Sequence, residues 1–281
     1  MARELRRLLI PPERLEDAAQ AAAGGDGSGG GDRPEFTLTP AESRYLTRVL
    51  RYGPGDRFAV LDGAGGLWGA QLLADQRVRL EQPLQAPLER QAPPRPRLVL
   101  AAAVVKRDFE VVVRMAVELG VDHLLPLQCE RTAVQGQLRP ERWRSIAAEA
   151  AEQCERLWLP EIAEPCPLPA LLERSLPVAA AADSLPLRLW ATTRRPDCRA
   201  LVEVLSQLGS VPAPASQPAP LPAEIWLAIG PEGGWSEAEE RQALASGWLA
   251  VDLGPRILRS STACVAGLSE LSSWRGRLCG C

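Results

Sequence analysis

Glu224-Ile225-Trp226-Leu227-Ala228-Ile229-Gly230-Pro231-Glu232-Gly233-Gly234 joins a short apolar run to a loop that holds three glycines, one proline and one carboxylate. The segment after this loop contains Ser236, with Glu239 three positions later. This spacing is typical of a capping box at the start of a helix. The stretch therefore predicts a buried strand, a glycine loop and a capped helix, which is the arrangement at which α/β folds bind ligands.

A second stretch has the same design. The apolar run Leu249-Ala-Val-Asp-Leu253 breaks at Gly254 and continues through Pro255 to Ala263. Two strand ends close in sequence, each followed by a glycine turn, predict one pocket built from two adjacent loops. Neither loop matches the Gly-x-Gly-x-x-Gly or Walker-type phosphate motifs. On residues alone, the first loop is either a ligand loop or a plain tight turn.

Composition limits the possible functions. The 281 residues are 46% hydrophobic with a formal net charge of −3, so one large or two medium domains are expected. The overall charge does not indicate nucleic-acid binding, which would need a local patch. Lys106 is the only lysine, and arginine is the better partner for phosphate and carboxylate groups.

The seven cysteines form no Cys-x-x-Cys pair, and His123 is the only histidine. No conventional zinc set is evident, so we expect no metal and a reduced, cytoplasmic protein. His123 is interpreted as a packed or surface residue at a strand start. No stretch reaches the roughly 20 apolar residues of a membrane span, and no signal peptide is recognised.

The amino-terminal part reads as several short strands at close spacing, which predicts a small β-barrel over residues 1–85. Residues 18–32 are rich in alanine and glycine and are expected to form a flexible insertion. A helix begins near Thr39. Its Arg44, Arg48 and Arg51 form either a solvated face or a binding surface. A proline-rich linker is placed at 86–97.

The remaining residues, 98–281, form the second predicted domain. Residues 98–104 read as a buried strand, 107–119 as a helix and 121–127 as the next strand, which is a β-α-β unit and predicts a parallel sheet. A further helix is expected over 139–156 and a further strand over 187–192.

The two glycine loops together resemble the paired signature motifs of the 16S ribosomal RNA uracil-N3 methyltransferase family of the SPOUT superfamily. The segments that carry the resemblance are Ile229-Gly-Pro-Glu-Gly-Gly234, Leu253-Gly-Pro-Arg-Ile-Leu-Arg259, Glu118-Leu-Gly-Val121, Glu130-Arg131, Glu152-Gln-Cys-Glu-Arg156, Arg48-Val-Leu-Arg51 and Gly53-Pro-Gly-Asp56. The resemblance covers nearly the whole chain. It implies an α/β fold in which a PUA-like β-barrel domain precedes a SPOUT-type, trefoil-knotted parallel-sheet domain.

The resemblance also implies S-adenosylmethionine as cofactor, 16S ribosomal RNA in the small ribosomal subunit as substrate, and a homodimer. The residues that match the family's cofactor motifs, or end the strand beside them, are Ala191, Thr192, Ile229, Gly230, Pro231, Glu232, Gly233, Gly234, Leu253, Gly254, Ile257, Leu258, Arg259 and Ser260. RNA contacts are expected from Arg7, Arg44, Arg48, Arg51 and Lys106.

Methylation at N3 of uridine requires loss of the imide proton, and negative charge then spreads to the flanking carbonyls. An arginine stays protonated, so it cannot be the base, but it stabilises the developing anion. Arg131 and Arg259 are the candidates for this role. Glu232 is either an orienting group or proton acceptor, or an acceptor that only stabilises the loop.

The chain departs from the family pattern at Ser261, where a glutamate is usual, and near Tyr45, where a histidine is common. These departures leave two alternatives open. One is an RNA-binding homologue that has lost catalysis, in which case Ser261→Glu should raise activity. The other is a SPOUT methyltransferase that acts on another RNA position.

Overall fold

The computed structural model describes residues 5–23, 33–133, 138–174, 186–193, 195, 197–208 and 221–279. The chain divides into two compact units. The first contains Met1–Pro93 and Ala151–Leu159, and the second contains Pro94–Ala150 and Pro160–Cys281. Within the described ranges, no helix is long and apolar enough to cross a bilayer. Part of the predicted insertion, 24–32, and the proline-rich stretch 209–220 lie outside these ranges.

The first unit is built on a six-stranded sheet with the order β1-β3-β4-β5-β2, and β6 also pairs with β4. Its strands are β1 (Arg7–Leu9), β2 (Glu35–Thr37), β3 (Arg57–Leu61), β4 (Gly66–Leu72), β5 (Arg77–Leu80) and β6 (Glu89–Arg90). β1 and β3 are parallel, and the other pairs are antiparallel. Strand β6 lies inside the stretch that the sequence suggests is a linker.

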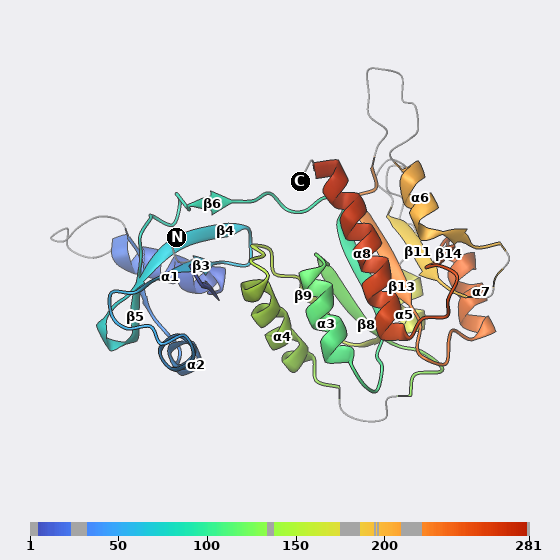
Figure 1. Ribbon diagram of the computed structural model, residues 1–281, viewed down its shortest axis with the longest axis horizontal. Helices are drawn as coiled ribbons and strands as arrows, with labels where there is room; N and C mark the ends of the chain where they lie inside the picture. The colour runs from blue at the N-terminus through green and yellow to red at the C-terminus, as the bar shows by residue number, and fades with distance from the viewer. Residues whose placement is uncertain are drawn as a thin grey trace, which may run out of the picture. The chain divides into compact units, whose positions relative to one another are not determined.

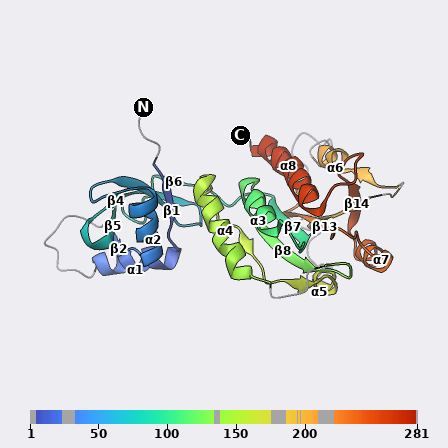
Figure 2. The ribbon, with the colours of Figure 1, turned by 60° about the horizontal axis from the view of Figure 1, so that its bottom comes forward.

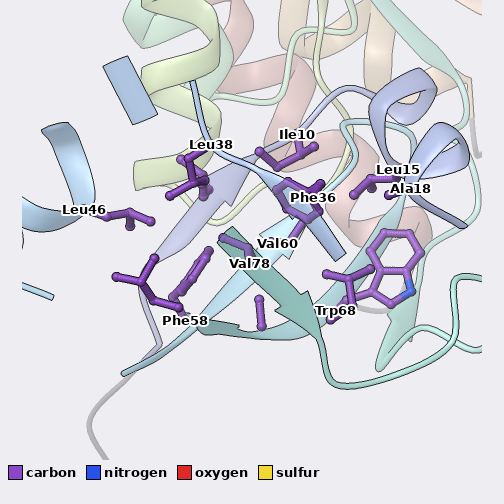
Figure 3. Packing of buried hydrophobic residues seen from close by; sticks show 14 of the residues in the cluster. Ile10, Leu15, Ala18, Phe36, Leu38, Leu46, Phe58, Val60, Trp68 and Val78 are labelled. Carbon is purple, nitrogen blue, oxygen red and sulfur yellow. The ribbon is translucent and has the colours of Figure 1, made fainter. Parts of the chain in front are cut away.

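Alternating residues of these strands point to one core. Phe58, Val60, Trp68 and Val78 are buried there and pack with apolar residues from the flanking helices (Figure 3). These helices are α1 (Pro12–Ala23), α2 (Pro40–Arg44), the π-helical turn η1 (Tyr45–Val49) and the 3₁₀ turn η2 (Ala74–Gln76). Thr39 caps α2 through a capping box with Glu42.

Helix α1 continues to Ala23, so residues 18–23 are helical rather than part of the flexible insertion expected from composition. Alanine has the highest intrinsic helix propensity, and Ala18 is buried against the core of the unit. The alanine-rich half of that stretch therefore extends a helix, a distinction that composition alone did not make.

The first unit is completed by residues 151–159, which come from much later in the chain. The backbone N–H of Gly65 donates to Leu157 O (3.0 Å), and that of Leu159 donates to Gly63 O (2.9 Å). The N–H of Leu9 donates to the Glu152 carboxylate at 2.7 Å. The return segment thus satisfies backbone groups at β1 and at the turn between β3 and β4.

The second unit holds an eight-stranded sheet in which every pair is parallel. The order is β10-β8-β7-β13-β11-β14-β12, with β9 also paired to β8. Its strands are β7 (Arg97–Ala103), β8 (His123–Gln128), β9 (Glu161–Ile162), β10 (Cys166–Pro167), β11 (Leu187–Ala191), β12 (Arg199–Ala200), β13 (Glu224–Ile229) and β14 (Leu249–Asp252). This confirms the predicted parallel sheet.

Helices cover both faces of this sheet, as a buried parallel sheet requires. Figures 1 and 2 show α3, α6 and α8 on one face and α5 and α7 on the other. The helices are α3 (Phe109–Glu118), α4 (Pro140–Gln153), α5 (Leu168–Arg174), α6 (Leu201–Gln207), α7 (Glu237–Ala245) and α8 (Ser260–Cys279).

Helix α8 is held tightly against the sheet at two points. A Cβ at Gly267 would come within 2.5 Å of Leu227 Cδ2, so α8 packs closely on the Leu227 side chain of β13 at this glycine. Near the other end, Arg275 donates to the Asp122 carboxylate at 2.5 Å and to Gly120 O at 2.6 Å. Both charged side chains are buried, at 12% and 8% exposure. The start of α8 is thereby fixed beside the end of β13.

Candidate functional site

Three strand ends meet at one edge of the second unit. β11 lies between β13 and β14, although both follow it in the chain. Because the three strands are parallel, their carboxyl ends and the loops after them lie side by side. Such a change in strand order is where open α/β sheets bind ligands.

A cavity of about 610 Å³ opens between these loops. All of the predicted cofactor residues except Arg259 line it: Ala191, Thr192, Ile229, Gly230, Pro231, Glu232, Gly233, Gly234, Leu253, Gly254, Ile257, Leu258 and Ser260. The two loops therefore share one pocket, as their spacing in the sequence predicts.

The glycine loop is shaped by a tight turn. The N–H of Gly234 donates to Pro231 O at 2.8 Å, and Gly234 has φ +70°, which a residue with a side chain rarely adopts. A Cβ at Gly230 would lie 2.9 Å from the Trp235 ring. The loop backbone and the indole are therefore in direct contact on one wall of the cavity.

Two hydrogen bonds tie the three loops together. The Ser260 hydroxyl at the start of α8 donates to Gly230 O at 2.7 Å. The Trp235 indole donates to Ala191 O at 2.8 Å, and its ring stacks on Trp190 with centroids 3.9 Å apart. Each loop is thus positioned by the others, and the cavity is preorganised.

Arg131 lies on the rim of the same loop. Its Nη1 donates to both Gly233 O and Trp235 O at 3.1 Å. Arg131 lines the cavity as expected, with one guanidinium nitrogen already engaged in holding the loop. Its remaining N–H groups are the ones that could stabilise the developing anion.

Glu232 lines the cavity and is exposed, and no described residue donates a hydrogen bond to its carboxylate. The capping role at this helix start belongs to Glu239, which accepts from Ser236 N at 2.8 Å. The loop-stabilising interpretation of Glu232 therefore has no hydrogen bond to support it among the described residues.

Arg259 is exposed and does not line the cavity, although its neighbours Leu258 and Ser260 do. Lys106 is also exposed, after the end of β7. His123 begins β8, is half-buried and lies outside the cavity lining. Burial lowers its pKa, and its Nε2 is 3.7 Å from Glu161.

The cavity also includes residues that the sequence did not single out. They are Thr193, Arg195, Cys198, Trp235, Glu240, Asp252 and Ala263. Pro255 and Arg256 also line the cavity and belong to the predicted loop 253–260. Trp235 and Asp252 directly adjoin the predicted loops, so their position could have identified them. Arg195, Cys198 and Glu240 had no such signal, because they meet the cavity only through the packing of β11 beside β13. Burial raises the pKa of the Cys198 thiol.

The arginines of the first unit fall into two groups. Arg7 is committed within its unit: it contacts the Glu155 carboxylate at 2.7 Å and its side chain is 16% exposed. Arg44, Arg48 and Arg51 are exposed on α2, on η1 and just after η1, and form no ion pair within the described residues. Of the four arginines of this unit that are predicted to bind RNA, only these three have guanidinium groups without an ion-pair partner among the described residues.

Comparison with known proteins agrees with this architecture. Residues 92–272 match the RNA methyltransferase domain, and residues 38–80 match the RNA methyltransferase PUA domain. The fold and the loop-built cavity thus define an RNA methyltransferase with an amino-terminal PUA domain, which confirms the resemblance recognised in the sequence.

Individual relatives indicate which kind of RNA methyltransferase the chain resembles. Ribosomal RNA small subunit methyltransferase E of Synechocystis sp. is 36% identical over 269 residues, covering 95% of this chain and 77% of the relative. The protein of the same name from Bacillus subtilis is 27% identical, with 86% and 91% coverage. The chain belongs to the ribosomal RNA small subunit methyltransferase E family.

A solved structure supports the same fold. The crystal structure of ribosomal RNA small subunit methyltransferase E from Neisseria gonorrhoeae, bound to S-adenosyl methionine, aligns with a TM-score of 0.68 and 25% identity. The alignment covers 96% of this chain and 98% of that structure.

Proposed function

We propose that this protein transfers the methyl group of S-adenosylmethionine to N3 of a uridine in 16S ribosomal RNA of the small subunit. The observation that carries the proposal is the preorganised cavity between the loops after β11, β13 and β14. Family membership and the cofactor named in the Neisseria gonorrhoeae structure support it.

The residues of the cavity fit this cofactor. Its volume lies within the range of small-molecule sites, roughly 300–1,000 Å³. Gly230, Gly233 and Gly234 let backbone amides approach a ligand closely, and the Trp235 ring offers an apolar surface. Three carboxylates, from Glu232, Glu240 and Asp252, suit a ligand with two positive centres. When bound, the cofactor supplies an electrophilic methyl group on sulfonium sulfur.

The chain's own residues would accept the proton of the substrate and stabilise the negative charge that forms on it. Glu232 is exposed in the glycine loop and has no hydrogen-bond donor among the described residues, whereas Glu240 is partly buried in α7, so Glu232 is the better-placed acceptor for the imide proton of uridine. Arg131 keeps N–H groups beyond the nitrogen that holds Gly233 O, and these would stabilise negative charge on the uracil carbonyls. Arg259, exposed beside the cavity, would contact RNA or the developing anion.

The proposal extends to the assembly and the substrate. RNA would be held by Arg44, Arg48 and Arg51, and by Lys106 of the second unit. A homodimer, the trefoil knot and a cytoplasmic location follow from the family resemblance and belong to the same proposal. Light scattering of the purified protein at micromolar concentration tests the dimer, since a monomer mass would overturn it.

Methyl transfer is tested on the RNA itself. We expect mass spectrometry of 16S ribosomal RNA to show loss of one methyluridine when the gene is deleted. The wild type should restore it, and Arg259→Ala should restore it poorly. Arg241→Ala, a change at an exposed position of α7, is the matched control and should restore it fully. Unchanged RNA after deletion would contradict the proposal.

A further inference from the structure

A pair of opposite charges lies in the cavity wall outside the two glycine loops. Arg195 follows β11, and Glu240 lies in α7. Arg195 Nη1 is 3.7 Å from Glu240 Oε1, which is too long for a hydrogen bond. Among the described residues of the wall, no other oppositely charged pair lies within 4 Å.

A third residue orients the guanidinium group of Arg195. Arg195 uses Nε and Nη2 on the Asp197 carboxylate, at 2.9 and 2.6 Å. This bidentate contact fixes the guanidinium plane and leaves Nη1 directed at Glu240. Asp197 itself is largely exposed and does not line the cavity.

Glu240 is left unsatisfied by this arrangement. Its Oε1 is buried and accepts no hydrogen bond. A buried carboxylate oxygen without a donor is costly. Because Oε1 itself has almost no accessible surface, a donor brought by a ligand would reach the exposed remainder of this side chain. The side chains of Arg195 and Glu240 are 28% and 22% exposed, which leaves both reachable from the cavity.

The spacing of the pair matches one part of the proposed cofactor. An α-amino acid carries an ammonium and a carboxylate on the same carbon, with the charged atoms about 3 Å apart. An arginine and a glutamate kept close but not hydrogen-bonded present the complementary charges at similar separation. The adenine and ribose of the cofactor carry no such pair of charges.

We propose that Arg195 binds the carboxylate, and Glu240 the ammonium, of the amino-acid end of S-adenosylmethionine. The inference rests on the proposed function, because it assigns a subsite within the same cavity. It makes Arg195 and Glu240 specificity-determining residues that distinguish the complete cofactor from its nucleoside portion, and Asp197 a positioning residue.

Two ligands separate this subsite from the rest of the cavity. S-adenosylhomocysteine has the amino-acid end, whereas 5′-methylthioadenosine lacks it and keeps the nucleoside. Calorimetry on the full chain should show that Arg195→Gln and Glu240→Gln each weaken S-adenosylhomocysteine by about tenfold or more. Binding of 5′-methylthioadenosine should stay within about twofold, since neither change removes a contact to it.

The control is Arg241→Ala, next to Glu240 on α7 but with a side chain 76% exposed, which should alter neither affinity. Equal losses for both ligands, or no loss for S-adenosylhomocysteine, would overturn the inference and leave the proposed function standing. Equal affinity of the wild type for both ligands would also overturn the inference and leave the proposed function standing. A wild type that binds neither would overturn the proposed function as well.

Discussion

At the scale of single residues, the exposed carboxylate in the glycine loop has a role that the neighbouring side chains do not explain. Glu232 is exposed at the cavity and has no hydrogen-bond donor among the described residues, while Glu239 caps the helix. A group kept free beside a methyl donor is available to accept a proton.

We expect Glu232→Gln to lower the rate of methyl transfer by about 100-fold, because a general base contributes on that order. Cofactor affinity should change little. Single-turnover methylation of small subunits and calorimetry with S-adenosylhomocysteine separate the two effects. Glu237→Gln, an exposed change in the same helix start, serves as control. Equal rates for Glu232→Gln and wild type would remove Glu232 from the mechanism.

Two thiols, one half-buried and one fully buried, predict a loss of stability at alkaline pH. Burial raises the pKa of Cys129 and of Cys264 to about 12. In the unfolded chain both thiols ionise near pH 8.5, so above that pH the unfolded state releases protons that the folded state retains. The free energy of unfolding should fall by up to about 1.4 kcal/mol per pH unit for each thiol between roughly pH 9 and 11.

Urea unfolding from pH 8 to pH 11 measures this slope. The double variant Cys129→Ala, Cys264→Ala should have a visibly shallower slope than wild type, whatever its stability at pH 7. The same slope in both proteins would show that these thiols do not ionise differently on unfolding.

At the scale of elements, the cavity depends on how α8 is held. Its first residue, Ser260, binds Gly230 O, while its last turns are anchored by Arg275 on Asp122. Helix α8 thus contacts the glycine loop at its start and carries a buried ion pair near its end.

Removing one partner of this buried pair leaves the other charge uncompensated, which costs about 3 kcal/mol or more. Arg275→Met should therefore lower the free energy of unfolding by about this amount, as measured by urea denaturation. Adding Asp122→Asn should restore part of the loss, because no buried charge then remains. A double variant no more stable than the single one would argue against the ion pair as the cause.

At the scale of the whole molecule, RNA affinity is expected to depend on arginines that are free of internal partners. Replacing Arg44, Arg48 and Arg51 with alanine should reduce the slope of log affinity against log salt by about 1 for each phosphate that the variant no longer neutralises. Filter binding of a 16S RNA fragment at several salt concentrations measures this slope.

The matched control is the triple variant of Arg57, Arg77 and Arg79. These side chains are 47–60% exposed in the same unit but pair with Glu81 or Glu35. Removing them should change the slope much less, because their charge is already neutralised. If both triple variants reduced the slope equally, the free arginines would not form the RNA contact surface.

Much of the fold was predictable because local patterns determined it. The apolar run before Gly230 and the capping box at Ser236 placed β13, its loop and α7, and the matching run before Gly254 placed β14. Long-range packing was not predictable in this way. Nothing near Arg195 or Glu240 in the sequence indicates that they meet. They come together because β11, which precedes Arg195, pairs with β13, which precedes the helix that carries Glu240. Likewise, the predicted helix over 139–156 gave no sign that its end completes the first unit.

That completion has a consequence for the order in which the protein is made. The backbone groups of Leu9, Gly63 and Gly65 find their partners in residues 152–159, which are synthesised only after more than half of the 281-residue chain. During translation, the first unit therefore lacks these hydrogen-bond partners while the early strands of the second unit leave the ribosome. A fragment that ends at Pro93 would lack these partners permanently, so we expect that no single cut of the chain releases a complete first unit.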